Sequence, residues 1–175
     1  MGVVNKPEVS RTIVGFYAGM AVFLAVMFGV IFYFIYTDAP EGGFVGLIVL
    51  AVIAPIVEGL MLWVLASLYR TRYVVTNGEL VLEASSLIGG TKTIPLETTQ
   101  SVQRTLIPFG FRLFGASFYG GHYYIPSIGK TFMVITNFDD GVLIKTKNGN
   151  YIITPKNPNN FIENIEKNKL KATKT

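Results

Sequence analysis

Two long apolar runs separated by only seven residues constrain this chain more than any other feature. Residues 13–36 carry no charged side chain, and residues 44–69 carry one. As a helix with a rise of about 1.5 Å per residue, the shorter run extends about 36 Å, which is enough to cross a bilayer core of about 30 Å. The connecting "TDAPEGG" is long enough only for a tight loop. The sequence therefore predicts a hairpin of two transmembrane helices.

Basic residues at the ends of these runs predict how the hairpin crosses the membrane. Lys6 and Arg11 precede the first run, Arg70 and Arg72 follow the second, and the loop between the runs contains only acidic charges. Lysine and arginine accumulate on the cytoplasmic side of membrane proteins. We therefore expect a multi-pass protein of the cell membrane with both termini cytoplasmic, and Arg70 and Arg72 as juxtamembrane anchors.

One acidic residue, Glu58, lies near the middle of the second run, three positions after Pro55. Inserting an acidic side chain at that depth costs on the order of 3 kcal/mol, so such residues are candidates for function. We identify Glu58 as a candidate intramembrane polar site. It can be structural, as a protonated acid bonded to a backbone carbonyl or as a contact in an oligomer, or it can handle a proton or solute.

Small residues recur at helical spacing along the first run, at Ala18, Ala21, Ala25 and Gly29. Stripes of this kind let transmembrane helices approach closely. We expect this stripe to pack against the second helix of the hairpin, with a contact between copies of the chain as the alternative.

Beyond Arg70 the pattern changes to short runs typical of β-strands. Asn77-Gly78 and Asn148-Gly149 stand between such runs and are strong hairpin-turn sequences. About seven short strands are expected before residue 157, and no helix.

The last part of the chain switches to helical spacing. Pro158 opens the segment, and Phe161, Ile162 and Ile165 form an apolar stripe on one side of it. The sequence predicts an amphipathic helix over about 158–170 that closes one end of the sheet.

Residues 72–168 resemble the bacterial PH domain families. The resemblance rests on "TRYVVTNGELVLEA", "KTIPLETTQSVQ", "GASFYGGHYYIPSIGKTFMVIT" and "DGVLIKTKNGNYIITPKNPNNFIENI". Within the last of these, "ITPKNPNNFI" corresponds to the piece that joins the final strand to the closing helix in such domains. The resemblance implies a membrane-anchored α+β protein: a two-helix transmembrane hairpin followed by a PH-like antiparallel β-barrel or sandwich of about seven strands closed by a C-terminal helix. It implies an interaction module and argues weakly for any one function.

Few residues in the chain could carry catalysis or hold a metal. There is no cysteine and one histidine, His122, and no Walker loop, nucleophile elbow or HExxH motif occurs. Asp139 and Asp140 precede Gly141 and indicate a turn rather than a metal site. We expect no catalytic residue, no metal, no cofactor and no enzymatic activity.

Basic residues after Arg70 are scattered rather than clustered with aromatic residues, so we expect no nucleic-acid partner. The first hairpin, "TNGEL", contains no lysine or arginine. The phosphoinositide binding of many eukaryotic PH domains, which uses basic residues flanking that hairpin, is therefore not carried over to this chain.

Residues 106–118, "LIPFGFRLFGASF", combine many apolar side chains with one arginine. Hardly any linker separates Tyr69 from the first expected strand, so the domain must lie close to the bilayer. We expect this loop to fold over the end of the barrel and fill the core. Two further hypotheses are that it dips into the interface with Arg112 at the headgroups, or that it meets a partner protein. The candidate membrane or partner contacts are Phe109, Phe111, Arg112 and Phe114.

These expectations divide the chain into a cytoplasmic N-terminal tail (1–12), two transmembrane helices (13–36 and 44–69) with an external loop between them (37–43), a cytoplasmic PH-like domain (70–170) and a tail (171–175). The predicted function is a non-enzymatic scaffold or regulator that presents its domain for protein or lipid-surface interaction. The expected partners are membrane lipids and a protein partner or a second copy of the chain. The alternative is a subunit of a membrane transport or membrane-modifying complex that uses Glu58.

Overall fold

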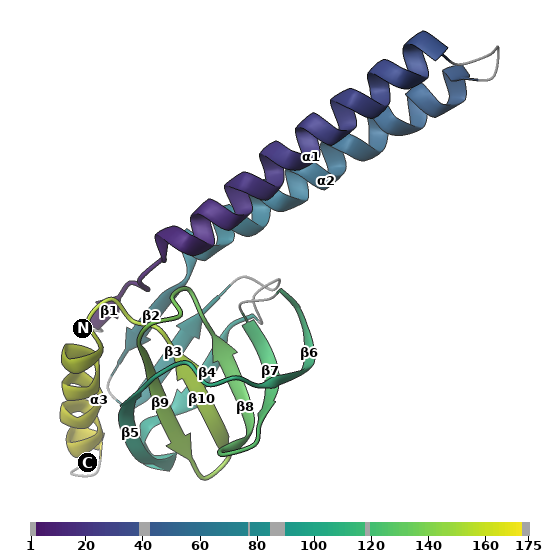
Figure 1. Ribbon diagram of the computed structural model, residues 1–175. Coiled ribbons are helices and arrows are strands. Elements are labelled where there is room, and N and C mark those ends of the chain that lie inside the picture. Colours follow the sequence, from purple (N-terminus) through teal and green to yellow (C-terminus); the bar gives the residue numbers. More distant parts are fainter. Residues whose placement is uncertain (1–2, 39–42, 77, 85–89, 118–119, 173–175) are drawn as a thin grey trace. The chain divides into compact units, whose positions relative to one another are not determined.

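The computed structural model describes residues 3–38, 43–76, 78–84, 90–117 and 120–172 (Figure 1). The chain divides into two compact units. One is a helical hairpin, Arg11–Ala66, and the other, the β unit, is formed by Met1–Ser10 together with Ser67–Thr175. Most of the predicted 37–43 loop, Asn77 of the first predicted turn, and the end of the 171–175 tail lie outside the described residues.

The hairpin consists of α1 (Arg11–Asp38) and α2 (Gly43–Arg70), which match the two apolar runs and extend them slightly. Both helices are long and apolar enough to cross a membrane. Half-buried residues recur every three or four positions along each helix, as expected for a seam with a 3.5-residue repeat. They include Ala21, Leu24 and Phe28 on α1 and Leu50, Ala54, Val57 and Met61 on α2.

The predicted small-residue stripe does not form this seam. Ala18, Ala25 and Gly29 are exposed, and only Ala21 is half-buried. A Cβ atom placed on Gly29 would meet nothing within 4 Å. The prediction that the stripe packs against α2 is wrong, because the larger Leu24 and Phe28 occupy the seam.

The strands of the β unit form two sheets that do not close into a barrel in the described part of the chain, so of the expected barrel or sandwich the barrel is wrong (Figure 1). The first sheet has the order β1 (Val3–Asn5), β2 (Arg72–Val75), β3 (Glu79–Glu83), β4 (Lys92–Pro95). The second has the order β5 (Thr99–Thr105), β9 (Gly141–Thr146), β10 (Gly149–Ile153), β8 (Gly129–Val134), β7 (Gly120–Ile125), β6 (Phe111–Ser117). A short 3-10 helix, Leu96–Thr98, connects β4 to β5 and is a small exception to the expected absence of helix before residue 157.

Three features of these sheets differ from the expected antiparallel arrangement. β1 comes from the segment expected to be an N-terminal tail, and it pairs with β2. β6 lies within the segment expected to be a loop. The β9–β10 hairpin inserts between β5 and β8, which makes β8 and β10 parallel neighbours, with Met133 opposite Ile152.

The predicted C-terminal helix is present as α3 (Pro158–Ala172), and its Phe161 and Ile165 are fully buried. Phe161 packs edge-on against Tyr73 of β2, with ring centroids 6.0 Å apart. The Tyr73 hydroxyl donates a hydrogen bond to the Val134 carbonyl of β8 at 3.5 Å. Burial raises the pKa of Tyr73 to about 12, so the phenol remains a donor at neutral pH. Tyr73 thus joins both sheets and the helix in one core.

Residues 3–10, called the N-terminal strap below, are bound across the ends of β8 and β10. Because these strands are parallel, the residues that follow them, Thr136 and Thr154, come side by side, and both are fully buried. The Thr136 hydroxyl donates to the Glu8 carbonyl at 2.6 Å. The two threonine hydroxyls are 2.8 Å apart, and Thr154 Oγ1 accepts the Thr136 N–H at 2.9 Å.

Main-chain hydrogen bonds complete the attachment of the strap. The Glu8 N–H donates to the Thr154 carbonyl at 3.1 Å, and the Ser10 N–H donates to the Thr136 carbonyl at 2.7 Å. The Lys156 N–H donates to the Lys6 carbonyl at 3.1 Å. Since α1 begins at Arg11 and α2 ends at Arg70, the chain leaves and re-enters the same β unit at the two ends of the hairpin.

Replacing Thr136 with valine tests this attachment. Thr136→Val removes the hydroxyl that the Glu8 carbonyl needs, at a cost of about 1–3 kcal/mol for a buried group left unsatisfied. Amide hydrogen exchange across residues 3–10 should become roughly 5 to 150 times faster, while β9 and β10 keep their protection. Thr93→Val is the control, because Thr93 is exposed on β4. Unchanged exchange in the strap would mean that the threonine pair does not hold it.

Candidate functional site

The six-stranded sheet is apolar on both faces. Strand register places Phe132, Val134 and Ile153 on the face whose core includes Tyr73 and α3. The opposite face carries a second buried cluster made of Ile125, Met133, Ile135, Leu143 and Ile152. Among the described residues, the partly buried side chains that pack against this second cluster are Ile107, Tyr123 and Ile128.

The segment 106–110 covers this second face by approaching it closely. A Cβ atom on Gly110 would lie 3.0 Å from Ile125 Cγ1 and 3.3 Å from the Tyr124 carbonyl oxygen. A Cβ atom on Gly141 would lie 2.7 Å from Ile107 Cδ1. Glycine at these two positions therefore lets the segment settle onto the sheet, with Ile107 facing inward.

The other side of the same segment is exposed and apolar. Phe109 is 82% exposed, Phe111 is 61% exposed, and their rings pack edge-on with centroids 5.7 Å apart. Phe109 also lines a groove of about 390 Å³ together with Ile107, Tyr123, Ile135 and Phe138. Phe138 is itself half exposed. We call Phe109, Phe111 and Phe138 the aromatic patch.

Residues 106–118 were expected to fill the core, to dip into the interface or to meet a partner protein, and the two sides of the segment differ in which of these roles they can fill. Ile107 supports the core, as the first of these expectations predicted, while Phe109 and Phe111 are available for contact. Arg112 is half-buried and pairs with Tyr123 across the β6–β7 register, whereas Phe111 and Leu113 on either side of it are exposed. Burial raises the pKa of Tyr123, and the positive charge of Arg112 opposes that rise. Phe114 pairs with His122 in the sheet, and its side chain lies outside what the structure describes.

Phe138 was not identified from the sequence. It follows β8 in the turn "NFDDG", where Asn137 Oδ1 accepts the Asp139 N–H at 3.1 Å. A phenylalanine between turn residues has no strand or helix to bury it. This pattern was the sequence signal that Phe138 would be exposed. Its place beside Phe109 depends on the fold of the segment 106–110 and could not be inferred locally.

With this architecture described, comparison with known proteins identifies the family. The model of a family described as "Bacterial PH domain" matches residues 71–169, more than half of the chain. The chain belongs to the bacterial PH domain family. No curated protein and no solved structure matches it.

The remaining predicted positions belong to α2 and β2. Arg70 ends α2 and Arg72 begins the first strand of the PH domain opposite Glu83, and both side chains are exposed. Glu58 is half-buried on α2, and its Oε1 atom is covered without a hydrogen-bond partner among the described residues. The anchoring role of the arginines and both interpretations of Glu58 stay predictions.

The titratable residues that could suggest catalysis are dispersed in the described part of the PH domain. Asp140 forms a two-pronged ion pair with Arg104, and this pairing lowers the pKa of Asp140. His122 packs on the Phe132 ring at 5.1 Å between centroids. No group of three or more metal-ligating side chains occurs among the described residues.

Neighbouring substitutions separate the two sides of the covering segment. Ile107→Ala removes a side chain that packs on the second cluster, and we expect it to lower the free energy of unfolding of the PH domain by about 1–3 kcal/mol. Leu106→Ala should stay within about 0.5 kcal/mol, because Leu106 is 76% exposed. Urea unfolding of the full chain in detergent, followed by far-UV circular dichroism of its strand signal, measures both. Equal losses for the two variants would contradict the assignment of Ile107 to the core.

Proposed function

We propose that this chain is a non-enzymatic membrane protein that holds a PH domain against the cytoplasmic face of the membrane. The observation that carries the proposal is the composition of the β unit, which contains both the strap before α1 and the chain after α2. If α1 and α2 cross a bilayer as a hairpin, both of their outer ends must lie on the side of this unit. The exposed apolar side chains along both helices support lipid rather than water as their surroundings.

The distribution of charge supports the cytoplasm as that side. Lys6, Arg11, Arg70 and Arg72 lie at the ends of the helices joined to the β unit, and Asp38 and Glu41 lie at or between the other ends. Positively charged residues near membrane spans are retained in the cytoplasm. The PH domain is then cytoplasmic, as are both termini.

The aromatic patch is the surface with which the PH domain contacts the inner leaflet. Phe138 lies two residues beyond Thr136, which is bonded to Glu8 and Ser10 of the strap. Arg11, the next residue after Ser10, begins α1, so Phe138 and the groove it shares with Phe109 lie near the point where the chain enters the hairpin. Exposed aromatic side chains favour the interfacial region of bilayers. Membrane lipid is therefore the occupant that the connectivity supports best.

Single-cysteine labelling tests the arrangement directly, because the chain contains no cysteine. In intact cells, a membrane-impermeant maleimide should label Glu41→Cys in the loop between the helices. It should label Val4→Cys in the strap and Thr173→Cys after α3 only once the membrane is permeabilised. Labelling of Val4→Cys and Thr173→Cys from opposite sides of the membrane would contradict the proposal. Equal labelling of all three cysteines by the maleimide in intact cells would contradict it too.

Cross-linking to lipid tests the contact surface. In liposomes that contain a photoreactive phosphatidylcholine, we expect adducts on peptides that contain residues 106–111 and 138. The double variant Phe109→Asp with Phe111→Asp should lose more than half of them, because charged side chains are disfavoured among lipid chains. Leu170→Asp, an exposed leucine on α3, is the matched control and should leave the adducts unchanged. Absence of adducts on these peptides in the parent chain would rule out lipid contact at the patch.

A further inference from the structure

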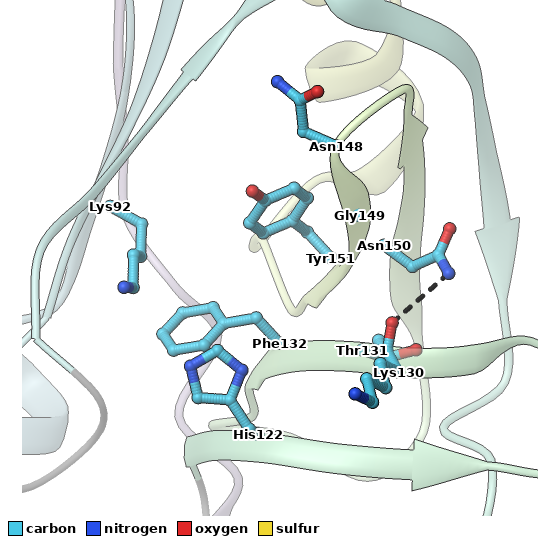
Figure 2. Close-up of a pocket in the computed structure, with 9 residues that line it drawn as sticks. All are labelled: Lys92, His122, Lys130, Thr131, Phe132, Asn148, Gly149, Asn150 and Tyr151. Carbon is cyan, nitrogen blue, oxygen red and sulfur yellow. Dashed lines mark hydrogen bonds between the residues drawn. The ribbon is translucent and has the colours of Figure 1, made fainter.

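A second cavity, of about 260 Å³, opens at the end of the β unit opposite the strap (Figure 2). Lys130 and Gly149, which line it, stand at the starts of β8 and β10, whereas Thr136 and Thr154 follow the ends of these parallel strands. Six residues of strand separate Lys130 from Thr136, a distance of about 20 Å at the usual rise of about 3.3 Å per residue. The cavity is therefore remote from the segment that leads into α1.

The lining of this cavity is basic. Lys92 comes from β4, Lys130 from β8 and His122 from β7, so strands from both sheets contribute. No carboxylate and no arginine line the cavity among the described residues, and within the same residues none of these three basic side chains forms an ion pair. Unpaired cationic side chains that converge on one cavity create a positive potential that attracts anions.

Aromatic rings form the wall behind these charges. The Lys92 ammonium lies 5.6 Å from the centroid of the Phe132 ring, and Figure 2 shows it pointing toward that ring. The His122 ring packs edge-on against the Phe132 ring. The Tyr151 ring also packs edge-on against Phe132, with ring centroids 6.3 Å apart. Phe132 is 4% exposed, so its ring is fixed by the core.

The cavity is also held in shape by Asn150. Its side-chain amide donates to the Ile128 carbonyl at 3.1 Å. It also donates to the Lys130 carbonyl at 3.3 Å, the bond drawn in Figure 2. These bonds tie β10 to the start of β8, which carries Lys130. The position of that backbone is thus set before any ligand arrives, which lowers the entropic cost of binding.

From these observations we propose that the cavity binds a small soluble organic phosphate. Lysine recognises phosphate as a point charge, whereas specific carboxylate recognition favours the paired donors of arginine, which the lining lacks. The volume lies just below the range of about 300–1,000 Å³ typical of drug-sized ligands, so a phosphomonoester with one ring is a suitable size. The ring would lie against Phe132 and Tyr151 while the phosphate meets Lys92, Lys130 and His122.

The position of the cavity argues for a soluble ligand rather than a lipid headgroup. This choice of source rests on the proposed membrane contact at the strap end, because the cavity lies about 20 Å from that end along β8. The cavity itself depends only on residues of the β unit. Failure of the membrane proposal would thus show in cysteine labelling and leave phosphate binding in place.

His122 provides a probe within the site, because it is the only histidine in the chain. The full chain, labelled at histidine with ¹³C, is placed in phosphatidylcholine nanodiscs and titrated with phenyl phosphate at fixed pH. We expect the ring resonance of His122 to shift saturably. Lys92→Gln and Lys130→Gln should each weaken binding roughly tenfold or more, the usual effect of losing one hydrogen bond to a charged group. Lys147→Gln, an exposed lysine on the neighbouring turn outside the lining, should bind normally.

A second set of nanodiscs, containing phosphatidic acid and no phenyl phosphate, identifies the source of the anion. We expect no shift of the His122 resonance from the lipid alone. A shift with phosphatidic acid, and no further shift when phenyl phosphate is then added to these nanodiscs, would assign the cavity to headgroups and overturn the proposal. An unshifted resonance in both experiments would overturn it too. If Lys147→Gln and Lys92→Gln weakened phenyl phosphate binding equally, the binding would be general charge attraction rather than binding at this cavity, and the proposal would be overturned.

Discussion

The parallel pairing of β8 with β10 is the constraint on which the rest of the molecule depends. It brings Thr136 and Thr154 together beyond the ends of the two strands, where no further strand partner is available for their main-chain groups. The strap supplies those partners, through Glu8 and Ser10. As a result, a segment more than 120 residues away in sequence becomes part of the same folded unit. Both ends of the hairpin are thereby joined to a single unit, which bears directly on how the chain can be arranged in a membrane.

The same pairing explains why an aromatic surface exists. A six-stranded sheet with β8 and β10 at its centre is apolar on both faces, so each face needs cover. One face shares a core with α3 and the first sheet, whereas the other has the segment 106–110 and little else among the described residues. A single layer of chain can bury Ile107 only by turning its neighbours outward. Phe109 is exposed as a consequence. Glycine at positions 110 and 141 allows the segment to approach the sheet this closely.

Local sequence patterns predicted the elements that local physics determines. Both apolar helices, the hairpin at Asn148-Gly149 and the helix from Pro158 follow from hydropathy, turn chemistry and helical spacing. The missed elements depend on distant partners: β1 is three residues long and β6 is an edge strand with two irregularities in its register. For the candidate site, Phe109 and Phe111 are exposed, and their role as membrane or partner contacts stays a prediction. Arg112 lies beside Tyr123 instead of among them, because alternation along β6 turns it away from its neighbours.

The two ends of the PH domain differ in chemistry, since one is apolar and the other is basic. At the strap end, the groove shared by Phe109 and Phe138 is apolar, and the chain continues into helices suited to lipid. At the other end, the cavity is lined by lysines and histidine, which require water or an anion as neighbours. On the proposed membrane arrangement, contact with lipid at the strap end buries the apolar area of the exposed phenylalanines, which would otherwise remain in water. β8 and β10 both run from the cavity toward the strap, so the apolar and the basic surfaces lie at opposite ends of the same strands. The two proposals therefore concern separate surfaces of the domain, and one can hold without the other.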